Sequence, residues 1–396
     1  MRVVIVGAGQ AGAAVAARLR ALGHNGEIIL IGDEPAPPYQ RPPLSKAYLL
    51  GEMGGERLWL RAPGFWTENK IDLRLGQPVN AVDPVTKTVT VGGEQIAYDQ
   101  LVLATGSVPR RLPSERGGNL EGIYTLRTLA DIDRMRPEFA SGRQVVVVGG
   151  GYIGLEAAAV ARKLDLEVTL LEAFPRILSR VASPHTSDFV RDLHRQKGVT
   201  LLEGISLERI RREDDSTFVQ LSDGRELRAH FVIVGVGVTP CTGLAELAGL
   251  HLENGIATDE MGRTSDPSIW AAGDCASFPW KGRRIRLESV GNAIDQAEAV
   301  AANLLGASQP YVARPWFWSD QYDLKLQIAG LSIGYDHVAL RNEGGTSVWY
   351  YRENELLAVD ALGDARAYMV GKRLIESGKS PAPWDVRSTP DLKVLL

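Results

Sequence analysis

Two short glycine-rich motifs are the parts of this sequence best suited to chemistry. Residues 7–12 read Gly-Ala-Gly-Gln-Ala-Gly and residues 149–154 read Gly-Gly-Gly-Tyr-Ile-Gly, each directly after an apolar run. A glycine turn between a buried strand and a helix lets the N–H groups at the helix N-terminus face a pyrophosphate. The sequence therefore predicts two dinucleotide sites. Their predicted contacts are Gly7, Gly9 and Gly12 in the first site and Gly149, Gly151, Ile153 and Gly154 in the second.

An acidic residue follows each motif at the end of the next predicted strand. Asp33 comes after residues 28–31, and Glu172 comes after residues 168–171. A carboxylate there binds the ribose hydroxyls of the adenosine half and repels a 2′-phosphate, so Glu172 favours NADH over NADPH. Arg176 and Arg180 follow closely and would soften that preference. For Asp33 the alternative interpretation is a solvent-exposed acidic turn.

Two further strand ends distinguish the first site from the second. Residues 101–106 predict a buried strand ending in Thr105-Gly106, where small residues let the backbone approach a cofactor closely. Residues 269–274 predict another, ending in Gly273-Asp274, whose carboxylate can bind ribitol hydroxyls. A helix starting near Ser289, with Val290 at its first position, would direct its N-terminus at reduced flavin. These features favour FAD in the first site, although Gly273-Asp274 is also consistent with an ordinary turn.

The elements that position these residues predict an α/β fold. It would have two Rossmann-like dinucleotide-binding domains, as in glutathione reductase, and a small α+β C-terminal domain. A chain of 396 residues is long enough for this number of domains. Around Gly237 the chain returns from the second dinucleotide domain to the first. The predicted boundaries are 1–113 with 238–312 for the FAD domain, 114–237 for the NADH domain and 313–396 for the C-terminal domain.

Composition excludes several other classes of function. A formal net charge of −4 argues against nucleic-acid binding, and six scattered histidines give no metal-site spacing. The two cysteines, Cys241 and Cys275, form no Cys-x-x-Cys and cannot ligate an iron–sulfur cluster by themselves. The apolar residues 144–161 include Glu156 and several glycines, so a membrane span is not expected. We expect a cytoplasmic protein without bound metal.

Several motifs, taken in order along nearly the whole chain, carry a family resemblance. They resemble the FAD-dependent NADH:ferredoxin reductases of bacterial oxygenase systems, the family of putidaredoxin reductase and biphenyl dioxygenase ferredoxin reductase. The most specific are Pro-Tyr-Gln-Arg-Pro-Pro-Leu-Ser-Lys at residues 38–46 and Trp-Phe-Trp-Ser-Asp-Gln at residues 316–321. The others are residues 103–106, 125–128, 149–156 and 273–274.

The resemblance implies roles for individual residues. It places one group against FAD, with Lys46 close to the isoalloxazine: Arg41, Lys46, Val79, Arg127 and Asp274. It places a second group on the NADH side: Glu156, Glu172, Arg180, Glu288 and Trp318. Among all of these, Lys46, Glu156, Glu288 and Trp318 would lie at the reacting groups. Without the resemblance, Trp318 is equally consistent with a core or interdomain aromatic residue.

The loop at residues 44–46 reads Leu-Ser-Lys, where flavin enzymes with an internal redox cysteine place that cysteine. This argues against disulfide reductases and thiol peroxidases. We therefore expect hydride transfer from NADH to FAD, followed by single-electron transfer to a [2Fe–2S] ferredoxin. That ferredoxin would serve a cytochrome P450 or a ring-hydroxylating dioxygenase.

Such ferredoxins are usually acidic, so a basic docking surface is expected. The candidates are Lys281, Arg283, Arg284 and Arg286 in one loop, and Lys372, Arg373 and Lys379 near the C-terminus. Ordinary solvated charge is the alternative interpretation of both groups. The main alternative function is an NADH:rubredoxin reductase, followed by an NADH oxidase. An alternative of another class is a flavin- and NADH-binding sensor like the apoptosis-inducing factors. The protein would be a monomer or a homodimer.

Overall fold

The computed structural model describes residues 1–214 and 216–396. Their mutual contacts group them into two units. Unit 1 comprises residues 1–40, 55–108 and 239–315, and unit 2 comprises residues 41–54, 109–238 and 316–396. None of the helices in these described ranges is both long enough and apolar enough to cross a membrane.

Unit 1 is built on a five-stranded parallel sheet with the order β19-β7-β1-β2-β3. Its strands are short, and β1 and β2 are buried along their whole length, as expected for a parallel sheet covered on both faces. Their bounds are β1 (Val3–Val6), β2 (Ile28–Ile31), β3 (Ile71–Arg74), β7 (Gln100–Leu103) and β19 (Ile269–Ala271).

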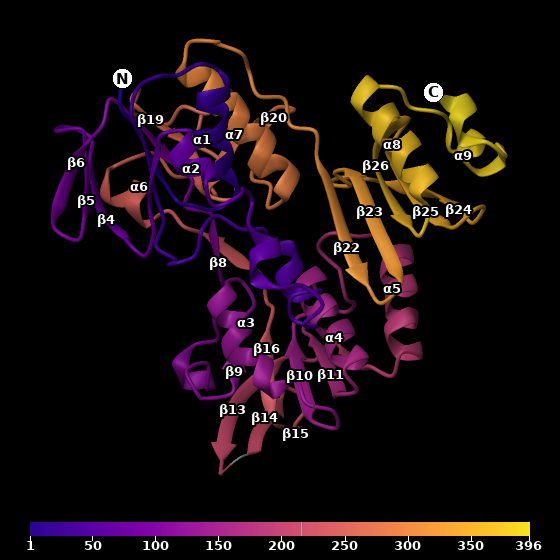
Figure 1. Cartoon of the computed structure of the whole chain (residues 1–396). Helices are drawn as coiled ribbons and strands as arrows, with labels where there is room; N and C mark the ends of the chain where they lie inside the picture. The colour runs from indigo at the N-terminus through magenta and orange to yellow at the C-terminus, as the bar shows by residue number, and fades with distance from the viewer. Residues whose placement is uncertain (215) are drawn as a thin grey trace. The chain divides into compact units, whose positions relative to one another are not determined.

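Two helices of unit 1 pack together against this sheet, α1 (Gln10–Ala21) and α7 (Val290–Leu304) (Figure 1). Small residues such as Ala13, Ala16 and Ala297 line their contact within the buried core. The helix expected to start near Ser289 is confirmed, with Ser289 as its N-cap. The shorter elements are η2 (Gly55–Leu58), α2 (Phe65–Glu68), β4 (Val79–Asp83), β5 (Thr88–Val91), β6 (Glu94–Ala97), α6 (Gly243–Leu247), β18 (Ile256–Ala257), β20 (Ala276–Trp280) and β21 (Arg283–Ile285).

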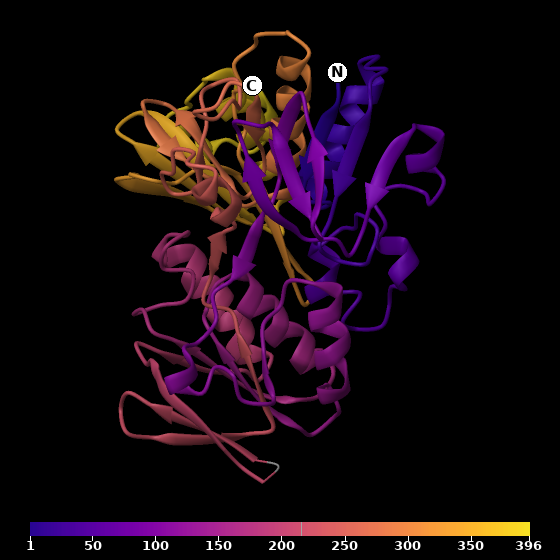
Figure 2. The same cartoon turned by 90° about the vertical axis from the view of Figure 1, so that its left-hand side faces the viewer.

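Unit 2 contains a second five-stranded parallel sheet, with the order β12-β11-β10-β16-β9. Its strands are β9 (Ile123–Tyr124), β10 (Gln144–Val148), β11 (Glu167–Glu172), β12 (Thr200–Glu203) and β16 (Phe231–Val234). Its helices are α3 (Leu129–Met135), α4 (Tyr152–Lys163) and α5 (Pro184–Gln196). The antiparallel strands β13 (Leu207–Glu213), β14 (Ser216–Leu221) and β15 (Glu226–Ala229) form a separate ribbon, pink at the bottom of Figure 2.

Unit 2 also contains the five-stranded antiparallel sheet of the C-terminal segment, with the order β22-β23-β26-β25-β24. Helix α8 (Ala365–Ser377) packs on this sheet, and α5 lies beside β22 and β23 (Figure 1). Side chains alternate between the two faces of a strand, so residues 317, 319 and 321 of β22 share a face. The strands are β22 (Trp316–Gln321), β23 (Leu324–Gly330), β24 (His337–Arg341), β25 (Thr346–Arg352) and β26 (Glu355–Leu362), and the remaining helices are α9 (Pro383–Ser388) and η5 (Leu392–Leu395).

The short elements that complete unit 2 are η1 (Pro42–Ser45), η3 (Ser114–Arg116) and η4 (Arg136–Glu138). Two short strands, β8 (Ser107–Pro109) and β17 (Val238–Pro240), span points where the chain passes from one unit to the other. The three-domain division expected from the sequence stays a prediction, because grouping by contacts places residues 41–54 and 316–396 together with residues 109–238.

Candidate functional site

In the first glycine motif, the packing of unit 1 leaves no room for a side chain at two of the three glycines, Gly7 and Gly12. Gly7 has a φ of +110°, and a Cβ there would stand 2.1 Å from the carbonyl oxygen of Ala104. A Cβ on Gly12 would stand 1.9 Å from the carbonyl oxygen of Gly7. Gly9 caps α1 with an ordinary φ of −87°, and an added Cβ would meet no described atom within 4 Å. The bare backbone at Gly9 therefore leaves room for an external phosphate, which fits a dinucleotide.

The second motif in unit 2 repeats this arrangement. A Cβ on Gly149 would stand 2.4 Å from the carbonyl oxygen of Gly235, and one on Gly154 would stand 2.0 Å from that of Gly149. Gly151 caps α4 with a φ of −81°, and a Cβ there would meet nothing within 4 Å among the described atoms. Ile153, on the first turn of α4, is 38% exposed. This cradle also fits a dinucleotide pyrophosphate.

Glu172 is tied to the backbone of the second glycine motif. One carboxylate oxygen accepts the N–H of Gly150 at 2.7 Å, and the other accepts the N–H of Phe174 at 2.8 Å. The side chain is buried at the end of β11. It therefore lies beside the motif, at the strand end from which a carboxylate can bind a ribose diol.

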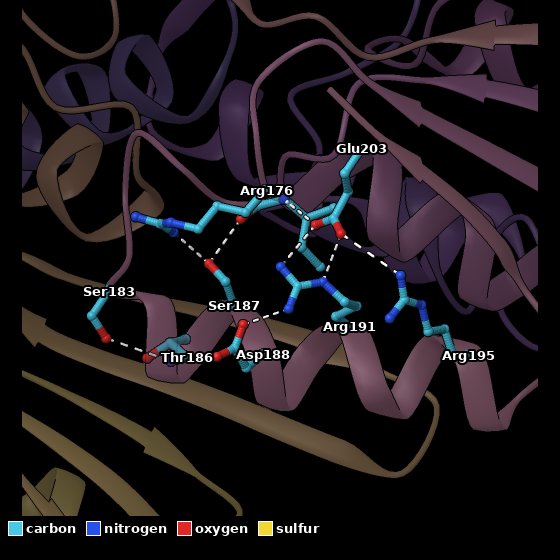
Figure 3. Close-up of polar contacts among 9 residues, drawn as sticks. Arg176, Ser183, Thr186, Ser187, Asp188, Arg191, Arg195 and Glu203 are labelled. Atoms are coloured by element: carbon cyan, nitrogen blue, oxygen red, sulfur yellow. Dashed lines mark hydrogen bonds and ion pairs between the residues drawn. The ribbon is translucent and has the colours of Figure 1, made fainter. Parts of the chain in front are cut away.

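The two arginines that follow Glu172, Arg176 and Arg180, differ in exposure and in their contacts, and Figure 3 shows the contacts of Arg176. Arg176 is half-buried and donates to the Ser187 hydroxyl at 2.5 Å and to the Ala182 carbonyl at 2.8 Å. Its guanidinium is thus used to hold its own loop against the N-terminus of α5. Arg180 is exposed, with its guanidinium carbon 6.0 Å from the centre of the Phe174 ring. Of the two arginines expected to soften the NADH preference, Arg180 is the exposed one, and the effect on nucleotide preference stays a prediction.

The next strand of the same sheet supports this loop. Glu203, the Cα partner of Glu172 in the β11–β12 pairing, accepts the N–H of Ile177 at 2.8 Å. Arg191 of α5 donates to both oxygens of Glu203, at 2.7 and 3.0 Å (Figure 3). A bidentate pair of this kind holds both side chains in one orientation.

Gly273 and Asp274 follow β19, and Gly273 lies close to the two packed helices α1 and α7 of unit 1. Gly273 has a φ of +82°, and its N–H donates to the side-chain oxygen of Gln296 in α7 at 2.9 Å. Asp274 is half-buried and accepts the Ser107 hydroxyl at 2.9 Å. The adjacent Cys275 is fully buried, and burial raises the pKa of its thiol. Cys275 is therefore a small core residue.

The remaining candidates of unit 1 lie at strand and helix ends. Asp33 is exposed after β2, whereas its neighbour Glu34 accepts the Tyr39 hydroxyl at 2.6 Å. Thr105 follows β7 and donates its hydroxyl to the Cys241 carbonyl at 2.7 Å. Glu288 precedes α7 and pairs with Arg286 at 2.5 Å. Three others occupy turn or terminal positions: Val79 begins β4, Gly106 has a φ of +70°, and Val290 begins α7.

A buried carboxylate, Glu156 of α4, holds three segments of unit 2 together. One of its oxygens accepts the Ser45 hydroxyl and the Lys46 ammonium, both at 2.7 Å. Its other oxygen accepts the Ser319 hydroxyl of β22 at 2.7 Å. Glu156 is only 4% exposed. Of the candidates expected at the reacting groups, the structure brings Lys46 and Glu156 into direct contact.

Trp318 and the two arginines expected near FAD also lie in unit 2. Trp318 is half-buried on β22 and stacks on Trp316, with ring centres 5.4 Å apart. Arg41 donates to the backbone carbonyl of Arg127 at 2.9 Å. The described residues include no group of three acidic, histidine or cysteine side chains that could hold a metal ion.

Sequence reasoning gave no role to Ser45, Ser319, Gln321 or His194. The first three lie inside motifs that carried the family resemblance. His194 lies in α5 and bonds to Gln321 of β22. Its position in the sequence gives no signal of that contact, because the contact depends on how distant elements pack.

Two family models together account for nearly the whole chain. The model described as pyridine nucleotide-disulphide oxidoreductase matches residues 1–297, and the one described as reductase C-terminal matches residues 316–396. The chain belongs to the pyridine nucleotide-disulphide oxidoreductase family. Membership of this family confirms the predicted α/β fold class and the predicted oxidoreductase chemistry with FAD and a nicotinamide nucleotide.

Individual relatives show which members of the pyridine nucleotide-disulphide oxidoreductase family this chain resembles. The ferredoxin reductase subunit of a 5,5′-dehydrodivanillate O-demethylase from a Sphingobium strain is 43% identical, over 95% of this chain and 93% of its own. A rubredoxin–NAD(+) reductase from Ectopseudomonas oleovorans is 38% identical, over 91% and 96%. The crystal structure of a covalent putidaredoxin reductase–putidaredoxin complex matches with a TM-score of 0.96 and 40% identity, over 100% of this chain and 97% of that one. The resemblance to ferredoxin reductases is therefore confirmed.

Proposed function

We propose that this chain is an FAD-containing, NADH-dependent ferredoxin reductase. It would pass electrons one at a time to a [2Fe–2S] ferredoxin that serves a cytochrome P450 or a ring-hydroxylating dioxygenase. The observation that carries the proposal is the pair of open glycines, Gly9 and Gly151, each at a helix N-terminus with a bare backbone. A related reductase crystallised in a covalent complex with putidaredoxin supports the choice of partner.

The proposed roles of the residues follow from where they lie and from the family resemblance. Residues proposed to bind FAD are Gly7, Gly9, Gly12, Asp33, Arg41, Lys46, Val79, Thr105, Gly106, Arg127, Gly273, Asp274 and Val290. Residues proposed to bind NADH are Gly149, Gly151, Ile153, Gly154, Glu156, Glu172, Arg180 and Gly237, together with Glu288 and Trp318. Bound FAD supplies the chemistry of accepting a hydride and releasing single electrons.

The chain's own contribution to the reaction is positioning and electrostatics. Glu172 would bind the ribose diol of NADH, and Glu156 would hold the Lys46 ammonium in a fixed place. A hydride transfer between two ring systems requires no side-chain acid or base, so accurate orientation is the main requirement. The sequence holds only two cysteines, and the loop at residues 44–46 places Ser45 against Glu156. No step therefore depends on a thiol in this loop.

Fewer basic residues are proposed for ferredoxin docking than the sequence suggested. Arg284 donates to the carbonyls of Thr258 and Ser277, and Arg286 is paired with Glu288, so both serve their own unit. Exposed positive charge is offered in unit 2 by Arg373 of α8 and in unit 1 by Lys281 and Arg283 of the β20–β21 hairpin, whereas the Lys379 ammonium donates to the carbonyl of Leu396. We propose these exposed groups, each within its own unit, as the partner-facing charges, in a cytoplasmic protein that is a monomer or a homodimer.

The main alternative is an NADH:rubredoxin reductase, which the rubredoxin–NAD(+) reductase relative favours. The test compares kcat/KM for putidaredoxin and for a rubredoxin at low and high salt. The proposal predicts a preference for putidaredoxin that weakens as salt rises, because opposite charges steer the encounter. A preference for rubredoxin, or a rate independent of salt, would reject the partner proposed here. A sensor would instead keep its NADH-reduced flavin for minutes in air and reduce neither protein well.

A further inference from the structure

Glu156 is the end point of a chain of buried hydrogen bonds in unit 2. Its oxygen that faces β22 accepts the Ser319 hydroxyl at 2.7 Å. Ser319 in turn accepts an N–H of the Gln321 amide at 3.1 Å. The Gln321 oxygen lies 2.8 Å from Nε2 of His194, and Nδ1 of His194 lies 3.3 Å from the Tyr322 hydroxyl. Ser319, Gln321 and His194 are all fully buried.

The direction of every bond in this chain is fixed by its end at Glu156. The Ser319 hydroxyl has one proton, and it donates that proton to the carboxylate. Gln321 must then donate to Ser319 with its N–H and accept with its oxygen, so Nε2 of His194 carries the proton. Nδ1 of His194 is left as the acceptor of the Tyr322 O–H. All donors therefore point towards the carboxylate, an arrangement in which each bond polarises the next.

The protonation state of His194 agrees with this direction of the hydrogen bonds. Burial lowers the pKa of His194 to about 4, so the ring is neutral near pH 7 and has one N–H. A neutral ring that accepts at Nδ1 and donates at Nε2 suits a chain with a single direction.

The chain of hydrogen bonds helps to fix the orientation of the Glu156 carboxylate. One carboxylate oxygen binds Ser45 and Lys46, and the other binds Ser319. With one oxygen held on each side, the carboxylate cannot rotate, and the Lys46 ammonium is fixed with it. We propose that Ser319, Gln321 and His194 are positioning residues that orient the Lys46–Glu156 pair for reduction of the flavin by NADH. This inference rests on the proposed function, which places that pair at the reacting groups.

The test uses a matched pair of serine variants of the FAD-loaded protein. Ser319→Ala removes the bond to Glu156. Ser347→Ala, in β25 of the same sheet, removes an equally buried hydroxyl that accepts the Trp349 N–H at 3.1 Å. We expect Ser319→Ala to lower the limiting rate of flavin reduction by NADH roughly tenfold, the size of one lost bond to a charged group. It should also shift the visible spectrum of bound FAD, whereas Ser347→Ala should change neither.

A second pair of variants tests His194, which lies in the hydrogen-bond chain farther from Glu156. His194→Leu removes the N–H donated to Gln321, and we expect a roughly threefold slower limiting rate. His194→Gln can donate an N–H from the same region, so it should recover most of that rate. Equal behaviour of Ser319→Ala and Ser347→Ala in both rate and spectrum would overturn the proposal.

The unmodified protein provides a readout that does not depend on activity, with a variant used only to assign the signals. The ¹⁵N NMR signals of His194, assigned by their loss in His194→Gln, should show a neutral ring with the proton on Nε2 at pH 7. A proton on Nδ1 would overturn the direction of the chain. Failure of the wild-type protein to pass electrons to a ferredoxin would reject the proposed function instead, and would leave this NMR result interpretable.

Discussion

At the scale of single residues, the two kinds of glycine in each motif have different reasons to be glycine. Gly154 is required by the chain's own packing, whereas Gly151 is bare on a side that meets no described atom. The fold thus explains why Gly154 is glycine, whereas for Gly151 the proposed nucleotide would supply the reason. The difference can be measured in the second motif by replacing Gly151 and Gly154, one at a time, with alanine.

We expect Gly151→Ala to raise the KM for NADH roughly tenfold, about 1.4 kcal/mol, with an unchanged melting temperature. Gly154→Ala should instead destabilise the protein by about 1–3 kcal/mol, because its Cβ would collide with the Gly149 carbonyl. Steady-state kinetics and thermal unfolding of both variants check this. If Gly151→Ala altered stability but not the KM, the cradle would not be a nucleotide site.

Glu172 binds two backbone N–H groups, and one substitution can separate this contact from its proposed role in choosing NADH over NADPH. Glu172→Gln keeps an oxygen for one of the backbone N–H groups but removes the charge that repels a 2′-phosphate. We expect the ratio of kcat/KM for NADH over NADPH to fall about tenfold, mainly through better use of NADPH. Glu203→Gln, on the neighbouring strand end, is the control that should leave the ratio unchanged. An unchanged ratio in Glu172→Gln would remove Glu172 as the determinant of nucleotide choice.

At the scale of elements, α5 is joined to the C-terminal sheet through a buried carboxyl group. Asp360 of β26 accepts the Thr186 hydroxyl of α5 at 2.7 Å and also accepts the Tyr350 hydroxyl of β25. Burial raises the pKa of Asp360 to about 6. The folded protein therefore keeps a proton between about pH 4 and pH 6 that the unfolded chain has released, so this group stabilises the fold less as the pH rises through that window.

Asp360→Asn should remove this pH dependence. Relative to the variant, the wild-type protein should lose about 1.4 kcal/mol of stability between pH 5 and pH 7.5, because pH 5 lies one unit below the folded pKa. Thermal unfolding of both proteins at the two pH values measures the difference. A constant difference between them would mean that Asp360 ionises at its ordinary pKa.

Elements were predictable where local patterns specify them. The strand after the second glycine motif was predicted at residues 168–171, and the structure has it within β11, which follows β10 and α4. The helix predicted near Ser289 is α7. A glycine motif and an alternating strand are short-range signals, which a sequence displays directly.

The long-range contacts of the site were not predictable in the same way. Ser45, Glu156 and Ser319 come from three segments, and only packing brings each serine hydroxyl to 2.7 Å from a carboxylate oxygen of Glu156. The contact of Arg176 with Ser187 was not predictable for the same reason, since Ser187 lies in the next helix. The sequence supplied the residue types, and tertiary structure decided which of them are committed to the fold.

At the scale of the whole molecule, the mechanism requires no redox-active side chain, and the sequence holds only the two cysteines Cys241 and Cys275. Cys275 is buried and has a raised pKa, so it does not serve as a thiol relay. The account therefore assigns electron transfer to one bound FAD, which would take a hydride from NADH and pass single electrons to the ferredoxin. This makes a quantitative demand, because NADH delivers an electron pair and a [2Fe–2S] ferredoxin accepts a single electron.

The most direct measurement is the anaerobic stoichiometry of the FAD-loaded protein with NADH and putidaredoxin, followed by absorbance. The account predicts a yellow protein that is bleached by NADH and reduces about two putidaredoxin molecules for each NADH oxidised. A colourless protein that takes up no FAD, or one that oxidises NADH without reducing putidaredoxin, would contradict it.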